Sequence, residues 1–176
     1  MNLFLIGYRC TGKTTVGQAL ARRLNWAFVD TDQMVVEAAG TSISRMVATN
    51  GWPFFRQQEH EALKTVSSGN RQVVAPGGGI VLDARNVALM RQSGRTVWLT
   101  ASEITIASRM QKDEQSAGSR PTLTGRGQIA EIKAVLAERI PLYAKAADLT
   151  VDTDQASIMA ICDRIVAAFG IEESRA

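Results

Sequence analysis

The sequence predicts an α/β domain in which helices cover both faces of a parallel β-sheet. Five short runs of apolar and β-branched residues alternate with longer stretches of helical periodicity, which is the pattern of successive βαβ units. The chain has 176 residues, of which 45% are hydrophobic and 21% charged, and this size and composition suit one globular domain. We therefore expect a single domain that spans residues 1–176.

Each strand is expected at one of the apolar runs. In chain order the runs are "LFLIG", "AFVD", "QVVAP", "TVWLT" and "LTVD", and helical patterns occur at "TTVGQALARRL", "ARNVALMRQ" and "EIKAVLAERIPLYAKA". Residues 33–68 are helical in pattern and contain no obvious strand, which predicts a helical insertion. Residues 111–127 are polar, with three Gly and one Pro, and a loop of this length in a compact domain is often functional, for example as a lid.

Composition and charge exclude several classes of protein. The two cysteines, Cys10 and Cys162, are far apart and form no CxxC pair, so neither a zinc site nor a disulfide framework is indicated. The net charge of +3 comes from scattered Lys and Arg, which favours a small anionic ligand over nucleic acid. No apolar stretch approaches the length of a membrane span, and the N-terminus has no signal-peptide pattern. We expect a cytoplasmic protein with no nucleic-acid or membrane partner.

The first loop matches the phosphate-binding pattern G-x-x-x-x-G-K-[ST] and lies between a predicted strand and a predicted helix. Glycines let the backbone approach a phosphate, the helix N-terminus favours negative charge, and the Lys adds a cation. The Thr that follows offers its hydroxyl to Mg²⁺. The residues expected to bind the nucleotide are Gly7, Arg9, Cys10, Thr11, Gly12, Lys13, Thr14 and Thr15.

Cys10 stands where many such loops have a glycine. It is either a small, inert residue or a reactive thiol, and the inert role is favoured because no second cysteine lies close in the sequence. The sequence disfavours a guanine-nucleotide switch, since no Asn is followed by Lys and no Asp has a Gly three residues later.

Two carboxylates follow the second predicted strand, in "FVDTD". Asp30 and Asp32 are expected at the carboxyl edge of the sheet, where open α/β folds bind ligands. Because they are two residues apart in an extended segment, both carboxylates are expected to point the same way, toward the mouth of the phosphate loop. One can then serve Mg²⁺ and the other an acceptor hydroxyl. The alternative is a pair of solvated aspartates in a turn.

Two further patterns extend this edge. In "FFRQQE", Arg56 and Glu59 have helical spacing, so the carboxylate can brace the guanidinium, or the two form an unremarkable surface pair. The glycines Gly77, Gly78 and Gly79 follow the third predicted strand and form either a tight turn or a bare backbone surface for a substrate. The single histidine, His60, has no metal-ligand partner nearby and is expected to be structural.

The order of these motifs resembles the shikimate kinase family: GxxxxGK[ST], D-T-D, F-R-x-x-E, G-G-G, R-P-x-L and R-x-x-L-Y, from Gly7 to Tyr143. The resemblance implies a P-loop fold with strand order 2-3-1-4-5 and transfer of the γ-phosphoryl group of ATP to the 3-hydroxyl of shikimate. It implies an acceptor-binding insertion at about residues 33–61 and a mobile lid at about 111–127.

The resemblance also implies residue roles. Thr14 and Asp30 resemble the Mg²⁺ ligands, and Asp32 resembles the base that holds the acceptor hydroxyl. Lys13 and Arg120 are similar to the residues that neutralise the transferred group, and Arg109 to the residue that packs on adenine. The residues that resemble the shikimate-binding set are Asp32, Arg56, Gly77, Gly78, Gly79 and Arg139.

The sequence departs from the family pattern at Cys10, which replaces a glycine, and at Pro76, where a small or hydroxyl residue is common. Two rivals stay open at this stage. One is another small-molecule P-loop kinase, for gluconate or a nucleoside monophosphate. The other is a nucleotide-binding regulatory or nucleic-acid module without turnover, which the intact D-T-D disfavours. A monomer is expected.

Overall fold

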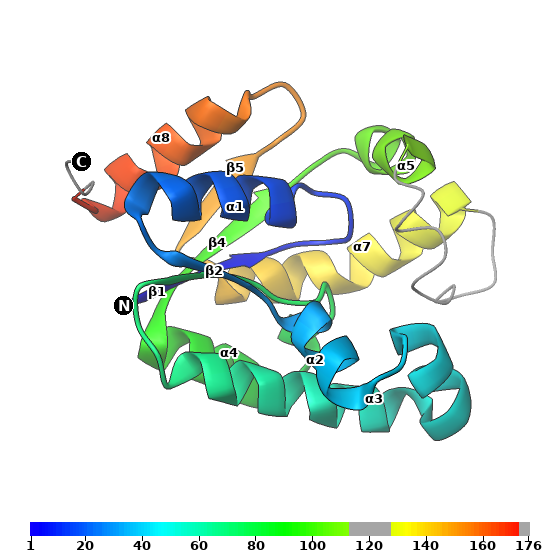
Figure 1. Cartoon of the computed structure of the whole chain (residues 1–176). Helices are drawn as coiled ribbons and strands as arrows, with labels where there is room; N and C mark the ends of the chain where they lie inside the picture. The colour runs from blue at the N-terminus through cyan, green and yellow to red at the C-terminus, as the bar shows by residue number, and fades with distance from the viewer. Residues whose placement is uncertain (113–127, 173–176) are drawn as a thin grey trace.

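The computed structural model describes residues 1–112 and 128–172, and its centre is a five-stranded parallel sheet with helices on both faces (Figure 1). The strand order is β2-β3-β1-β4-β5, which confirms the predicted fold class and order. Every neighbouring pair of strands is parallel. The strands are β1 (Asn2–Ile6), β2 (Ala27–Asp30), β3 (Gln72–Ala75), β4 (Gly94–Thr100) and β5 (Leu149–Asp152).

Strand β1 lies at the middle of the sheet and shows why both faces are covered. Leu3 and Leu5 point to one face, Phe4 and Ile6 point to the other, and all four side chains are fully buried. Successive residues of a strand alternate between faces, so a strand that is apolar at every position needs packing on both sides.

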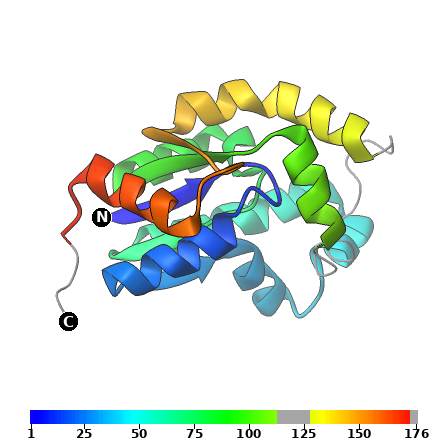
Figure 2. The same cartoon turned by 90° about the horizontal axis from the view of Figure 1, so that it is seen from above.

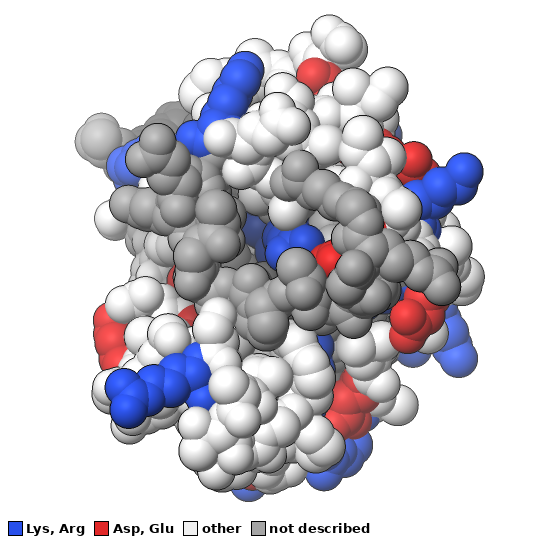
Figure 3. All heavy atoms as spheres, turned by 90° about the vertical axis from the view of Figure 1, so that its right-hand side faces the viewer, with Lys and Arg blue, Asp and Glu red and all other residues white. Residues whose placement is uncertain are grey.

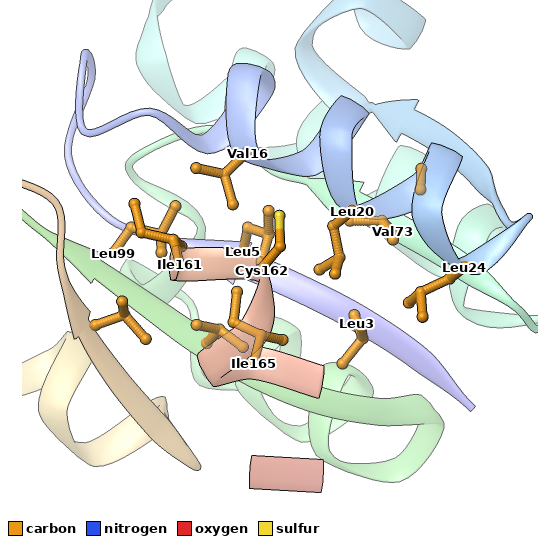
Figure 4. Close-up of a cluster of buried hydrophobic side chains, with 13 residues drawn as sticks. Leu3, Leu5, Val16, Leu20, Leu24, Val73, Leu99, Ile161, Cys162 and Ile165 are labelled. Carbon is orange, nitrogen blue, oxygen red and sulfur yellow. The ribbon is translucent and has the colours of Figure 1, made fainter. Parts of the chain in front are cut away.

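Helices α1 (Lys13–Leu24) and α8 (Ile158–Phe169) cover the first face (Figure 4). Leu20 of α1 and Ile165 of α8 pack with Leu3 and Leu5 in one apolar cluster. Among the helices, α8 was not singled out by the sequence, although its apolar residues recur at helical spacing.

The second face is covered by the carboxyl half of α3 (Ile43–Ser67), by α4 (Ala84–Ser93) and by α7 (Gln128–Ala146). These helices lie on the opposite side of the sheet from α1 and α8 in both views (Figures 1 and 2). Leu63, Met90 and Tyr143 supply one fully buried side chain from each helix. A short 3-10 helix, η1 (Ile80–Leu82), follows the glycine loop.

The helical segment after β2 consists of α2 (Thr31–Ala39) and α3. It has a small apolar cluster of its own, in which Val35 packs with Met46 and Phe55. Helix α3 is kinked at Gly51, whose φ of 80° is not helical, and Pro53 then lies in the first turn of the second part. The kink lets the two parts of α3 point in different directions.

The first two residues of the segment predicted as a loop, 111 and 112, belong instead to α5 (Glu103–Lys112). The rest of that prediction, residues 113–127, lies outside the described residues. Within residues 1–112 and 128–172, no helix is both long and apolar enough to cross a membrane.

Candidate active site

The loop between β1 and α1 has backbone angles that favour glycine. Gly7 has a φ of 141° and Gly12 a φ of 96°, and a methyl group on Gly7 would overlap the carbonyl of Leu99. Cys10 also has a positive φ, 60°, which costs a residue with a side chain more than it costs glycine. The backbone therefore keeps the conformation of a phosphate loop even where Cys10 replaces a glycine.

The side chain of Lys13 lies over this loop. Its ammonium group donates hydrogen bonds to the carbonyl oxygens of Gly7 (2.9 Å) and Tyr8 (2.8 Å). The hydroxyl of Thr11 donates to the same Tyr8 carbonyl (2.8 Å). The cation is thus held at the mouth of the loop, where an anionic ligand would meet both the ammonium group and the start of α1.

Asp30 and Thr14, the two predicted metal ligands, lie together. The hydroxyl oxygen of Thr14 is 3.5 Å from Oδ2 of Asp30. The other oxygen of Asp30 accepts hydrogen bonds from the backbone N–H groups of Asp32 (3.0 Å) and Gln33 (3.3 Å), which caps α2.

This cap corrects the predicted conformation of the segment. The two aspartates were expected in an extended stretch, but α2 begins at Thr31, so Asp32 belongs to its first turn. An N-cap aspartate starts a helix directly after itself, which explains why the strand ends at Asp30. Asp32 nevertheless faces the ligand side: its carboxylate lies against Gly77, where a methyl group would overlap it.

A cavity of about 340 Å³ lies beside the phosphate loop. Arg109 of α5 lines this cavity and donates hydrogen bonds to the hydroxyl (3.0 Å) and the carbonyl oxygen (2.6 Å) of Thr153. The hydroxyl of Thr153 in turn donates to the carbonyl of Thr11, which ties the loop after β5 to the phosphate loop. The lining includes the predicted nucleotide residues Cys10, Thr11, Gly12, Thr15 and Arg109.

A second cavity lies on the other side of the phosphate loop, toward α2 and α3. Figure 3 views this edge of the molecule, and atoms of basic and acidic residues lie next to one another in the recess at its middle. The structure brings together here every residue predicted for the acceptor. The lining residues are Tyr8, Arg9, Asp32, Ile43, Trp52, Phe55, Arg56, Glu59, Gly77, Gly78, Gly79 and Arg139.

Arg56 is held in place from two sides. Its guanidinium donates to Glu59 at 2.6 Å, and its Cζ lies 5.3 Å from the ring centroids of both Trp52 and Phe55. Glu59 is only 1% exposed, and its second oxygen has no hydrogen-bond partner among the described residues. Burial raises the pKa of Glu59, and the positive charge of Arg56 opposes that rise. The pair is therefore a partly buried brace, with a buried carboxylate, rather than a surface ion pair.

The glycine loop packs directly against these side chains. A methyl group on Gly79 would overlap the guanidinium of Arg56, and one on Gly77 would overlap the carboxylate of Glu59. The carbonyl of Gly78 accepts hydrogen bonds from Arg139 (3.2 Å) and from the hydroxyl of Tyr143. Close packing thus favours glycine at Gly77 and Gly79, in addition to any contact with a ligand.

The two side chains of α7 that bind the Gly78 carbonyl are buried. Arg139 is 7% exposed, and Tyr143 stacks on Trp98 with 5.7 Å between ring centroids. Burial raises the pKa of Tyr143 to about 12, so its hydroxyl keeps its proton at neutral pH and can donate to Gly78.

Arg9, which was predicted to bind the nucleotide, also lines the second cavity. Its guanidinium donates to Glu131 at 2.8 Å, and Glu131 is 1% exposed. Glu131 precedes Arg139 by two helical turns of α7, so this ion pair joins the phosphate loop to the helix that carries Arg139.

Several contributors to the site were not predicted. Tyr143 belongs to the R-x-x-L-Y motif and could have been found there, and Trp52 and Phe55 flank Arg56 at short spacing. Nothing in the sequence pairs Glu131 with Arg9, which is 122 positions earlier. Contacts of this kind depend on the fold.

Arg120 and His60 are the remaining residues that the sequence analysis discussed. Arg120, the predicted lid arginine, lies outside the described residues. His60 shares a 2.7 Å hydrogen bond with Asn86 of α4, which agrees with the expected structural role. No group of three or more His, Cys, Asp or Glu side chains suited to a metal ion occurs in the part of the chain that the structure describes.

Comparison with known proteins places this geometry in a family. A family model described as "Shikimate kinase" matches residues 9–169. The chain is 46% identical over 165 residues to a shikimate kinase of Nitratidesulfovibrio vulgaris, covering 94% of this chain and 93% of that one. It is 42% identical over 176 residues to one of Syntrophus aciditrophicus, covering 96% and 90%. A structure of shikimate kinase from Acinetobacter baumannii in complex with shikimate matches with a TM-score of 0.88 at 29% identity, covering 96% of this chain and 92% of that one.

Proposed function

Because the chain belongs to the shikimate kinase family, we propose that its two cavities hold the two substrates of the family's reaction. The enzyme transfers the γ-phosphoryl group of ATP to the 3-hydroxyl of shikimate, a step of aromatic amino acid biosynthesis. ATP would occupy the cavity beside Arg109 with its phosphates on the loop from Gly7 to Thr15. Shikimate would occupy the cavity between the phosphate loop, α3 and α7.

One observation carries this assignment: a buried arginine, a partly buried arginine and a carboxylate line the same small cavity. Arg56 and Arg139 come from different helices and both face the glycine loop. Guanidinium groups bind carboxylates with paired hydrogen bonds, so a hydroxy acid would be gripped at its carboxylate. Asp32 would then meet the hydroxyl groups at the other end of the acceptor.

The acceptor hydroxyl must lose a proton as it attacks phosphorus. We assign this proton to Asp32, because it lines the acceptor cavity together with Tyr8 and Arg9 of the phosphate loop. The hydroxyl oxygen forms a bond to the γ-phosphorus, the bond from that phosphorus to the β,γ-bridging oxygen breaks, and ADP leaves. This reaction depends mainly on positioning and on neutralising negative charge.

The positive charge comes from side chains at the phosphate loop. Lys13 is held at the loop mouth by two carbonyl oxygens, which it would exchange for phosphate oxygens. Arg120 is assigned to the lid of residues 111–127, and the insertion of residues 33–61 is assigned to acceptor binding. Closure of a lid would exclude water from the transferred group.

Thr14 and Asp30 would hold Mg²⁺. The residues present fit this ion, because a hydroxyl and a carboxylate oxygen 3.5 Å apart are hard ligands within reach of one cation. Two protein ligands are enough for Mg²⁺, which usually completes its shell with water and substrate phosphates. When bound, the ion would neutralise charge on the phosphates of ATP.

We also propose that the enzyme works as a cytoplasmic monomer without a nucleic-acid or membrane partner. The basic residues are scattered along the chain rather than gathered in one block, which supports a small anionic substrate. Light scattering on the purified protein should give a mass close to 19.1 kDa, whereas twice that mass would contradict a monomer.

Phosphate transfer to three acceptors tests the proposed assignment. ADP formation should be measured with shikimate, gluconate and AMP under the same conditions. Turnover with shikimate that exceeds the other two by at least about a hundredfold in kcat/KM is expected, since a polar site rejects acceptors that leave its groups unpaired. Comparable turnover with gluconate would mean that the arginine pair selects any sugar acid.

A further inference from the structure

Tyr8 directly follows Gly7 in the phosphate loop, and the environment of its hydroxyl group is unusual. Its side chain is 1% exposed, and its ring packs in an apolar cluster with Ile106 of α5 and Val135 of α7. The hydroxyl oxygen is buried and makes no well-aligned hydrogen bond with any described residue, although the guanidinium of Arg9 lies close to it. Nearly all buried polar groups in proteins are hydrogen-bonded, so such a group calls for an explanation.

Tyr143 provides a direct contrast within the same molecule. It is also fully buried, but its hydroxyl donates a hydrogen bond to the carbonyl of Gly78. Tyr143→Phe would remove that bond, whereas Tyr8→Phe would remove no well-aligned hydrogen bond within the described part of the chain. The hydroxyl of Tyr8 therefore contributes nothing visible to the stability of the fold.

The surroundings of Tyr8 indicate what would satisfy the hydroxyl. Tyr8 lines the acceptor cavity together with Arg9 and Arg139. The Cζ atom of Arg9 is 5.5 Å from the centroid of the Tyr8 ring, and Glu131 fixes that guanidinium with a 2.8 Å contact. Burial raises the pKa of Tyr8, with Arg9 opposing the rise, so the phenol stays protonated at neutral pH. A protonated hydroxyl can donate a hydrogen bond, and the guanidinium groups of Arg9 and Arg139 attract negative charge. An anionic oxygen would therefore satisfy the hydroxyl of Tyr8.

We infer that the hydroxyl of Tyr8 donates a hydrogen bond to the carboxylate of the bound acceptor, on the side gripped by Arg139. This inference rests on the proposed assignment of the cavity to shikimate. It makes Tyr8 a specificity-determining residue, because a neutral acceptor would leave the buried hydroxyl unpaired. It also means that the loop that holds the phosphates of ATP touches the second substrate directly.

The test is Tyr8→Phe, which keeps the ring and removes only the hydroxyl. The KM and the equilibrium dissociation constant for shikimate should both rise on the order of tenfold, as expected for the loss of one hydrogen bond to a charged group. The KM for ATP should stay within about twofold of the wild-type value. The melting temperature should be unchanged or higher, because the substitution removes an unpaired buried group.

Tyr143→Phe is the matched control for stability. It removes the hydroxyl of an equally buried tyrosine that has a hydrogen-bond partner, so its melting temperature should fall. If Tyr8→Phe lowered the melting temperature as much as Tyr143→Phe, the Tyr8 hydroxyl would have a structural partner and the inference would be wrong.

The methyl ester of shikimate identifies the part of the acceptor that is contacted. The wild-type to Tyr8→Phe ratio of kcat/KM should be about ten for shikimate and close to one for the ester, whose charge is removed. Equal ratios for both compounds, or a loss confined to kcat, would place the contact elsewhere and overturn the inference. A failed cavity assignment looks different, since Arg139→Lys would then bind shikimate as tightly as the wild type.

Discussion

The two halves of the site are built in different ways. The nucleotide half uses one continuous stretch, from Gly7 to Thr15, and depends on backbone geometry: positive φ angles, the start of α1 and a lysine folded over the loop. The acceptor half is assembled from the phosphate loop, α2, α3, the glycine loop and α7, and depends on side chains that brace one another.

Because of this difference, we expect the two halves to respond differently to substitutions. A backbone cradle tolerates changes of side chain, as Cys10 illustrates by keeping the loop conformation in place of a glycine. A site made of braced side chains depends on each partner, because the loss of one leaves the other buried and unpaired. We therefore expect substitutions in the acceptor half to act on shikimate while ATP binding is preserved.

The largest effect is expected for Asp32→Asn, which keeps the shape of the side chain but removes its charge. Turnover should fall by a factor of about 10²–10⁴ if Asp32 is the general base. The dissociation constant for ATP should change little, since the cradle is intact. Single-turnover kinetics separate the two quantities, and normal turnover in this variant would exclude Asp32 as the base.

A smaller effect is expected for Gly79→Ala. The new methyl group would overlap the guanidinium of Arg56 and push it out of its position, so the KM for shikimate should rise about tenfold. Gly69→Ala is the matched control, because its methyl group would overlap the end of the Gln72 side chain, and neither residue lines either cavity. Both variants should have near wild-type KM for ATP, and an equal rise in the shikimate KM of both would argue against a local effect.

The smallest expected effect concerns pH. Because burial raises the pKa of Glu59 above its ordinary value of 4.5, the native protein binds more protons than the unfolded chain between that value and the raised one. The free energy of unfolding should therefore decrease as the pH rises through this window. Denaturant titrations at a series of pH values from 4.5 upward measure this decrease. Glu59→Gln should make the decrease smaller, whereas an unchanged decrease would show that other groups cause it.

The same division explains what could be predicted from the sequence. The phosphate loop is local, so its pattern and its place between β1 and α1 were readable, and the five strands fell at the apolar runs. The conformation of Asp32 was predicted wrongly because the capping role of Asp30 was not considered. The Arg9–Glu131 pair could not be predicted, since only the packing of α7 against the phosphate loop brings these residues together.

The acceptor half was placed through motifs rather than geometry. F-R-x-x-E and R-x-x-L-Y pointed to Arg56 and Arg139, but nothing in their spacing indicates that both face the glycine loop. Trp52 and Phe55 contact Arg56 from the same part of α3, which follows the kink at Gly51, a single backbone angle that residue patterns do not specify. Tertiary structure therefore decides the details that select a substrate.

Equilibrium binding of each substrate to Arg139→Lys tests the division between the two halves most directly. Lysine keeps the charge but loses the planar fork that pairs with a carboxylate. We predict that calorimetry will show shikimate binding weakened by at least about tenfold and binding of a non-hydrolysable ATP analogue within twofold of wild type. Equal weakening of both ligands, or normal binding of shikimate, would contradict a site in which the backbone holds one substrate and braced side chains hold the other.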